Sequence, residues 1–157
     1  MKVAVAFDHR GVKLRGAVLR AIGETGHELV DLGVDTDAVR VDYPDQARAV
    51  GRAILCGEAE RGVLVCGSGV GASVAACKIA GIRAAICHDA YSAHQGVEHD
   101  DMNVLCLGSE VVGESLSREL VSAFLGATFG GEDRYLERLQ KVQAMEEENW
   151  HGEVTAP

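Results

Sequence analysis

GVLVCGSGVGA, residues 62–72, joins a short apolar run to a turn with three glycines at alternate positions. The run is rich in valine and has no polar alternation, which is typical of a strand buried on both faces of a parallel sheet. After the glycines, residues 70–80 have the apolar spacing of a helix. A strand, a glycine turn and a helix in this order predict one unit of an α/β fold.

The same alternation continues along most of the chain. Four more short apolar runs are predicted as strands, at residues 2–7, 27–33, 83–87 and 103–108. Helical apolar stripes lie between or after them, at residues 14–22, 47–54 and about 113–126. Five strands separated by helices indicate a doubly wound α/β domain with a parallel sheet.

The 157 residues fit one domain, which we expect to span residues 1–148. A charged helix is predicted after Gly130 and Gly131, with Leu136, Leu139, Val142 and Met145 along one side. This stripe predicts packing against another surface, such as a second subunit. Residues 149–157 are expected to form a flexible tail.

Composition argues against several classes of protein. The net charge of −9, with no dense run of Lys or Arg, weighs against nucleic-acid binding. No apolar stretch reaches the roughly 20 residues that span a bilayer, and the first residues do not form a signal peptide, so we expect a cytoplasmic protein. The five cysteines form no CxxC pair, which predicts reduced thiols and no structural metal.

Ligands of such sheets bind beyond the carboxyl ends of the strands. The residues expected there are Asp8–His9, Cys66–Gly71, His88–Asp89 and Ser109–Glu110. Gly67, Gly69 and Gly71 can expose backbone N–H groups, which predicts an anion site. Gly67, Gly69 and Ala72 also fit the loose dinucleotide pattern G-x-G-x-x-A, although a tight connection without a ligand has the same appearance.

Four of the strand-end and helix residues have two interpretations each. Cys66 is either a small core residue or a thiol whose thiolate is favoured by nearby N–H donors, with the Ser68 hydroxyl beside it. Asp8 either caps the first helix or faces the crevice, and the two roles are compatible. Arg134 and Arg138 share one helix face, where they either pair with acids or clamp a phosphate.

Several motifs in one order resemble the B-type ribose 5-phosphate isomerases and the related galactose 6-phosphate isomerase subunits. They are FDHRGVKLR (7–15), VDYPDQA (41–47), residues 62–87, AYSAH (90–94), EHDDMNVLCLGS (98–109) and the pair Arg134/Arg138. The resemblance covers about residues 2–145. It implies a three-layer α/β/α Rossmann-like sandwich with a five-stranded parallel sheet and an extra C-terminal helix. It also implies no metal or other cofactor, and a homodimer or tetramer with shared active sites.

The implied activity interconverts an aldose phosphate and a ketose phosphate through an enediolate, with ribose 5-phosphate and ribulose 5-phosphate as the expected pair. The resemblance makes Cys66 the base, because relatives with a glutamate base carry it where this chain has Ala72. Ser68 stands where threonine is common. Gly67, Gly69 and Gly71 would provide the anion hole for the enediolate.

Further roles follow from the same resemblance. His99, helped by Asp8, would open the sugar ring. His9, Asp100, Arg134 and Arg138 would bind the substrate and its phosphate, the arginines reaching across from the partner subunit. Asp100 stands where many relatives have asparagine, and Glu110 where many have arginine. Both carboxylates would repel a phosphate dianion unless they point away or pair with arginines.

Three alternatives stay open at this point. The first is an isomerase of another phosphosugar, such as a tetrose or hexose phosphate. The second is a nicotinamide-dependent oxidoreductase, in which Asp89 would bind the ribose hydroxyls. The third is a non-catalytic partner subunit, which the combination of Cys66, Ser68 and His99 argues against.

Overall fold

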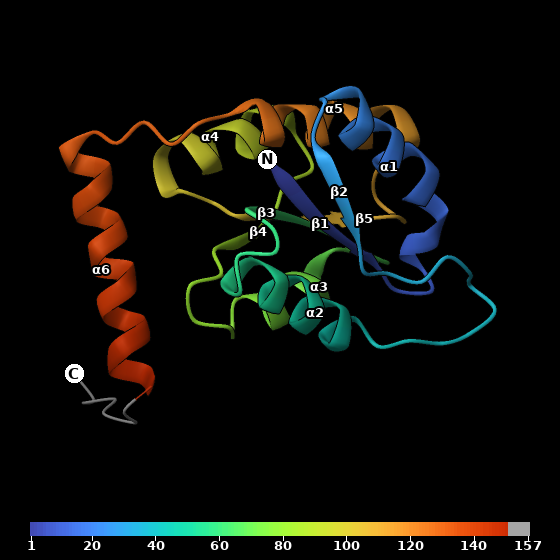
Figure 1. Ribbon diagram of the computed structural model, residues 1–157, viewed down its shortest axis with the longest axis horizontal. Helices are drawn as coiled ribbons and strands as arrows, with labels where there is room; N and C mark the ends of the chain where they lie inside the picture. The colour runs from blue at the N-terminus through green and yellow to red at the C-terminus, as the bar shows by residue number, and fades with distance from the viewer. Residues whose placement is uncertain (151–157) are drawn as a thin grey trace.

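The computed structural model describes residues 1–150, the last two by their backbone only. Its centre is a sheet of five parallel strands in the order β2-β1-β3-β5-β4 (Figure 1). The strands are β1 (Lys2–Phe7), β2 (Glu28–Asp31), β3 (Arg61–Cys66), β4 (Ala84–Ile86) and β5 (Val104–Gly108). All five lie where the apolar runs predicted them, so the expected α/β class is confirmed.

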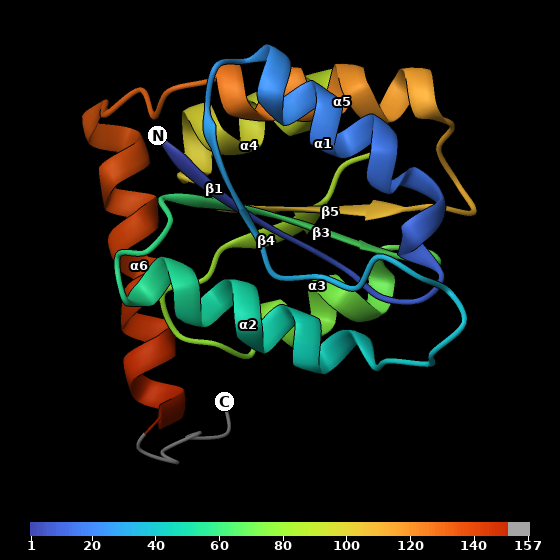
Figure 2. The ribbon, with the colours of Figure 1, turned by 45° about the vertical axis from the view of Figure 1, so that its right-hand side comes forward.

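Helices cover both faces of the sheet (Figure 2). One face carries α1 (Arg15–Glu24), α4 (Ala90–Asp100) and α5 (Glu114–Gly126), and the other carries α2 (Tyr43–Leu55) and α3 (Val70–Ala76). A short 3-10 helix, η1 (Gly11–Leu14), precedes α1. The side chains of β1 alternate between the two faces: Val3, Val5 and Phe7 join one core cluster, and Ala4 and Ala6 join the other. The result is the expected three-layer sandwich.

Helix α4 is an addition to the predicted elements. Its sequence is crowded with histidines and acids, so its polar residues hide the spacing of Ala93 and Val97, which are both fully buried. The Asp89 side chain accepts a hydrogen bond from the backbone N–H of Ser92 at 2.7 Å and so caps this helix. The helix ends at Asp101, which adopts a left-handed conformation with φ 49°.

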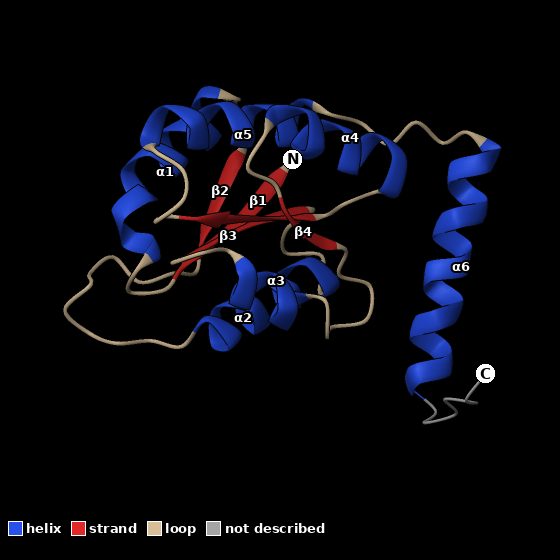
Figure 3. Cartoon of the chain, turned by 180° about the vertical axis from the view of Figure 1, so that it is seen from behind, coloured by secondary structure: helices blue, strands red, loops and turns tan. Residues whose placement is uncertain are grey.

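Helix α6 (Asp133–Trp150) stands to one side of the sandwich, past the edge where β4 lies (Figure 3). It confirms the predicted charged helix. The backbone N–H of Gly81 donates to Glu146 Oε2 at 2.9 Å, which ties the far end of α6 to the body. Leu136, Val142 and Met145 are exposed along it. Of the predicted tail, residues 149–150 continue α6, and the remainder lies outside the described residues.

Within residues 1–150, no helix combines the length and the apolar character that a membrane span requires. The same residues contain no cluster of three His, Cys, Asp or Glu side chains arranged to hold a metal ion.

Candidate active site

A cavity of about 220 Å³ lies at the carboxyl ends of β1 and β3. Three segments line it: Asp8–Arg10 after β1, residues 40–43 before α2, and the turn that begins at Cys66. Because parallel strands end at the same edge of a sheet, residues more than 50 positions apart meet here. Its volume lies below the roughly 300–1,000 Å³ of drug-sized ligand pockets, so it suits a small ligand.

The three glycines of the turn are required for different reasons. Gly69 has φ +81°, a conformation that favours glycine. Gly67 and Gly71 have no such backbone requirement. A Cβ on Gly67 would lie 2.7–2.9 Å from the guanidinium of Arg10, and one on Gly71 would lie 2.8–2.9 Å from the ring of Tyr43. These two glycines therefore make room for side chains that line the cavity.

Cys66 ends β3 at the cavity with 5% of its surface exposed. Its Sγ accepts a hydrogen bond from the backbone N–H of Gly69 at 3.2 Å. Ser68 is exposed in the same turn, and its Oγ accepts from the N–H of Val70 at 3.3 Å. The buried sulfur and the accessible hydroxyl thus face one small space.

The end of β5 holds the turn in place. The N–H groups of Ser109 and Glu110 donate to the carbonyl oxygens of Cys66 and Gly67, each at 2.9 Å. The backbone of Gly108 is in close contact with that of Ser68, because a Cβ on Gly108 would lie 2.6 Å from the Ser68 carbonyl. The turn that carries the sulfur is therefore fixed from both sides.

Asp8 and His9 lie in the cavity wall, as their strand-end position predicts. Asp8 is 5% exposed, and its Oδ1 accepts the N–H groups of Arg10 at 2.9 Å and Gly11 at 2.7 Å. It therefore orders the start of η1 while facing the crevice, so both roles are compatible with the structure. The Nδ1 of His9 lies 3.0 Å from the carbonyl oxygen of Val41 and ties the second segment to the first.

Glu110, expected to repel a bound anion, is instead paired with cations. Lys13 hydrogen-bonds its Oε1, and the Arg10 guanidinium lies 3.7 Å from the same oxygen. The hydrogen bond from Lys13, with a smaller contribution from Arg10, lowers the pKa of the Glu110 carboxyl from its ordinary value. The carboxylate does not line the cavity.

His88 and Asp89, also expected at the crevice, do not line the cavity. His88 Nε2 accepts the N–H of Gly108 at 3.2 Å, and Asp89 caps α4. The hydrogen bond from the Ser92 backbone lowers the pKa of Asp89. Strand β5 separates β4 from β3, so Asp89 does not end the strand beside the glycine turn. This arrangement removes the acid that the dinucleotide-binding alternative needs.

The remaining expected site residues form a second cluster, where α4 ends and α6 begins. The ring of His99 stacks on Tyr135, with centroids 4.3 Å apart, and its Nδ1 lies 2.7 Å from the side-chain nitrogen of Gln95. The guanidinium of Arg134 lies over the Tyr135 ring, 4.5 Å from the centroid of that ring. Arg138 is exposed one turn further along α6, and Asp100 is exposed at the end of α4.

The two clusters lie at opposite ends of the strands. Helix α4 starts just after the carboxyl end of β4 and ends just before β5 begins, so His99 is at the amino-terminal edge. Cys66 and Asp8 are at the carboxyl edge. Within one chain, Asp8 therefore does not reach His99, and the expected assistance would have to come from a different copy.

Sequence reasoning missed several residues of the two clusters, residues 40–42 of the cavity wall among them. Arg10 and Tyr43 line the cavity, while Gln95 and Tyr135 contact His99. The first pair had a signal, because both belong to the motifs FDHRGVKLR and VDYPDQA on which the family resemblance rests. Gln95 is four residues before His99 on a helix, a spacing that brings two side chains together, but the helix itself went unpredicted.

Comparisons with known proteins place the chain among sugar isomerases. The profile of the ribose/galactose isomerase family matches residues 3–142. Ribose-5-phosphate isomerase B of Escherichia coli is 42% identical over 93% of this chain and 97% of its own length. D-erythrulose-4-phosphate isomerase of Pectobacterium atrosepticum is 34% identical over 83% of this chain and 86% of its own.

A solved structure extends the likeness to three dimensions. Ribose-5-phosphate isomerase B of Clostridium thermocellum has a TM-score of 0.90 and 38% identity, over 95% of this chain and 99% of that one. The family profile spans residues of both clusters, and the relatives and the solved structure each cover more than four fifths of the chain. The chain belongs to the ribose/galactose isomerase family.

Proposed function

We propose that this protein is an aldose–ketose isomerase that interconverts ribose 5-phosphate and ribulose 5-phosphate through an enediolate, with Cys66 as the base. The observation that carries the proposal is the buried Cys66 sulfur, hydrogen-bonded to the Gly69 N–H in a small cavity of a sugar isomerase family member. The relatives named above act on phosphorylated sugars, which supports a substrate of this class.

The chemistry moves one proton between two neighbouring carbons. The Cys66 thiolate takes the proton from C2 of the open-chain aldose, and negative charge develops on the carbonyl oxygen at C1. The thiol then returns a proton to C1, while a hydroxyl proton moves from O2 to O1. Ser68, exposed at the same turn, is placed for that second transfer.

The enediolate needs donors aimed at its oxygens. The Gly69 N–H is already directed at the Cys66 sulfur, so it serves the base. The N–H groups of Gly67 and Gly71 are left for the developing charge, beside the first turn of α3, whose N–H groups have no partner within the helix. The glycines therefore divide between stabilising the thiolate and stabilising the intermediate.

Ring opening requires an acid–base group, and a second copy of the chain would supply it. Within one chain, His99 and Cys66 lie at opposite ends of the strands, so they cannot contact the same sugar. A twofold dimer can place the His99 cluster of one copy at the cavity of the other. Arg134, Arg138 and Asp100 would arrive with it, and the arginines would bind the phosphate with His9. Each dimer then has two complete sites.

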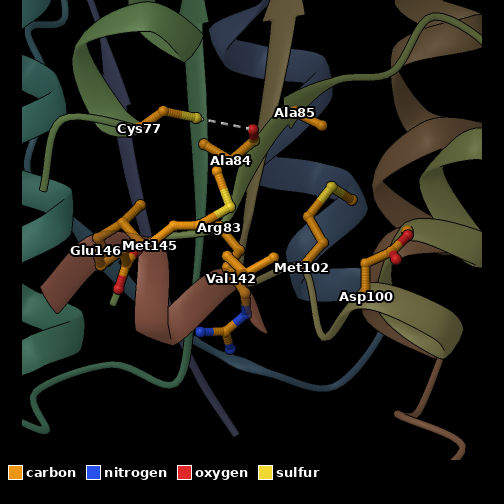
Figure 4. A pocket seen from close by; sticks show the side chains of 11 residues that line it. Cys77, Arg83, Ala84, Ala85, Asp100, Met102, Val142, Met145 and Glu146 are labelled. Carbon is orange, nitrogen blue, oxygen red and sulfur yellow. Dashed lines mark hydrogen bonds between the residues drawn. The ribbon is translucent and has the colours of Figure 1, made fainter. Parts of the chain in front are cut away.

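An apolar surface beside α6 supports this arrangement. A cavity of about 490 Å³ lies between α6 and β4, which is the outermost strand of the sheet that the described residues form. Figure 4 shows Met102, Val142 and Met145 around it, with Cys77 donating to the carbonyl oxygen of Ala84 at 3.1 Å. Burying this surface would favour association, and the exposed stripe on α6 would be covered.

Isomerase activity with a panel of aldose phosphates tests the reaction, and Cys66→Ala tests the mechanism. The variant should lose about a thousandfold in kcat, because the group that removes the proton from C2 is absent. Inorganic phosphate should still bind. Gly23→Ala is a suitable control, because a Cβ there meets nothing within 4 Å. Unchanged turnover in Cys66→Ala would remove the mechanism.

Complementation tests the shared site. Cys66→Ala and His99→Ala should each be inactive alone. Refolded together, they form mixed dimers that contain one intact site, so random pairing restores about a quarter of the wild-type activity. A mixture as inactive as its components would contradict a site built from two copies.

A further inference from the structure

Arg10 is a cavity residue to which the proposed reaction assigns no role. Its guanidinium lies against the backbone of Gly67, the residue after Cys66. A Cβ on Gly67 would be 2.7 Å from Cζ, 2.8 Å from Nε and 2.9 Å from Nη1 of Arg10. The guanidinium thus fills the space that a side chain at position 67 would occupy. A permanent positive charge therefore lies beside the turn that carries Cys66.

The backbone of Arg10 is held at both ends. Its N–H donates to the buried Asp8 carboxylate at 2.9 Å, and its carbonyl oxygen accepts from the Ser109 hydroxyl at 2.9 Å. These contacts join the segments after β1 and β5. An arginine whose main chain is fixed in this way loses less entropy when its side chain binds a ligand.

The side chain keeps most of its donors for a ligand. Among the residues that the structure describes, Glu110 is the carboxylate within ion-pair distance, at 3.7 Å from Nη2. That carboxylate is bound more closely by Lys13. Asp8, an acid of the same cavity, already accepts two backbone N–H groups. A guanidinium has five N–H donors, so several stay available.

We propose that Arg10 binds the phosphate of the substrate in the Cys66 cavity, beside His9. The inference rests on the proposed function, because the phosphate belongs to the sugar phosphate proposed there. Arg10 and the base Cys66 come from the same chain. A planar guanidinium can bind two oxygens of a phosphate through two parallel N–H bonds, a fixed geometry that a lysine ammonium does not present. Glu110, which Lys13 also binds, lies beside the Arg10 guanidinium and does not contact the phosphate.

The test measures phosphate binding and turnover separately. Arg10→Gln should raise both the Kd of inorganic phosphate, measured by calorimetry, and the KM of ribose 5-phosphate by about tenfold or more, as expected for the loss of charge-assisted hydrogen bonds. Its kcat should stay within about twofold, because ground state and transition state carry the same phosphate. Arg10→Lys keeps the charge and loses the planar fork. Its Kd for phosphate and its KM should lie between those of the wild type and those of Arg10→Gln.

Arg20→Gln is the matched control. Its side chain is 59% exposed and pairs with Glu114 at 3.5 Å, against 57% exposure and a 3.7 Å pair for Arg10, but it lies on α1 away from the cavity. The control should bind phosphate as the wild type does. Thermal unfolding of each variant identifies any that fails to fold.

The phosphate titration decides the proposal even without turnover. If the wild-type protein isomerises no aldose phosphate, the proposed function fails, yet the calorimetric comparison still shows whether Arg10 binds phosphate. Phosphate affinity in Arg10→Gln equal to that of the wild type and of Arg20→Gln would overturn the inference. So would a wild-type protein that binds no inorganic phosphate.

Discussion

Replacing Gly108 with alanine would displace the turn that carries Cys66 without removing any group that takes part in the chemistry. Gly108 ends β5 and is buried against the turn. An added Cβ would lie 2.6 Å from both the carbonyl carbon and the oxygen of Ser68, where ordinary contacts begin at 3.4 Å. Because both contacts are with backbone, no side-chain rotation relieves them, and the turn must move by roughly 0.8 Å.

The size of that movement sets the expected effect. A displacement of about 1 Å in a reacting group costs about a hundredfold in rate, so kcat/KM should fall by about tenfold to a hundredfold. Overpacking a tight contact costs about 1–3 kcal/mol of the free energy of unfolding. For a chain of this length, each kcal/mol lowers Tm by about 2–4 °C, so the variant stays folded at 25 °C.

The assay compares Gly108→Ala with Gly23→Ala, which adds the same methyl group to an open helix position. Isomerase rates and calorimetric Tm values are measured for both. The control should keep its activity and gain stability, by about 0.4–1 kcal/mol. Wild-type kcat/KM in Gly108→Ala would refute the argument that the position of the turn controls the reaction, and would leave the close contact as a packing feature.

Three further predictions concern other parts of the molecule. Arg134→Ala combined with Arg138→Ala should raise the KM for the sugar phosphate at least about tenfold, in steady-state assays, because two phosphate-binding cations are lost. Cys87 should resist iodoacetamide at pH 8 while the exposed Cys56 reacts, as read by mass spectrometry, because burial raises the pKa of the Cys87 thiol to about 11 and keeps it protonated there. Gln95→Leu should change the pH profile of ring opening more than that of isomerisation of an open-chain substrate, since its contact orients the histidine ring of the second cluster.

The amino-acid sequence determined the strands of this protein and indicated an anion site at its glycine turn. Apolar runs marked all five strands, because strands covered on both faces contain few polar residues. The order of Cys66, three glycines and a helix was enough to predict an anion site at a strand end. These features are local, so they can be read from neighbouring residues.

Long-range contacts decided what the sequence left open. Strand order placed β5 beside β3, which separated Asp89 from the glycine turn and argued against dinucleotide binding. Packing from distant segments explains why positions 67 and 71 have no side chain, because Gly67 and Gly71 accommodate Arg10 and Tyr43. Because α4 runs back from the end of β4 to the start of β5, His99 and the Cys66 of the same chain lie at opposite ends of the strands. No periodicity encodes such placements, because they arise when elements far apart in the chain pack on one sheet.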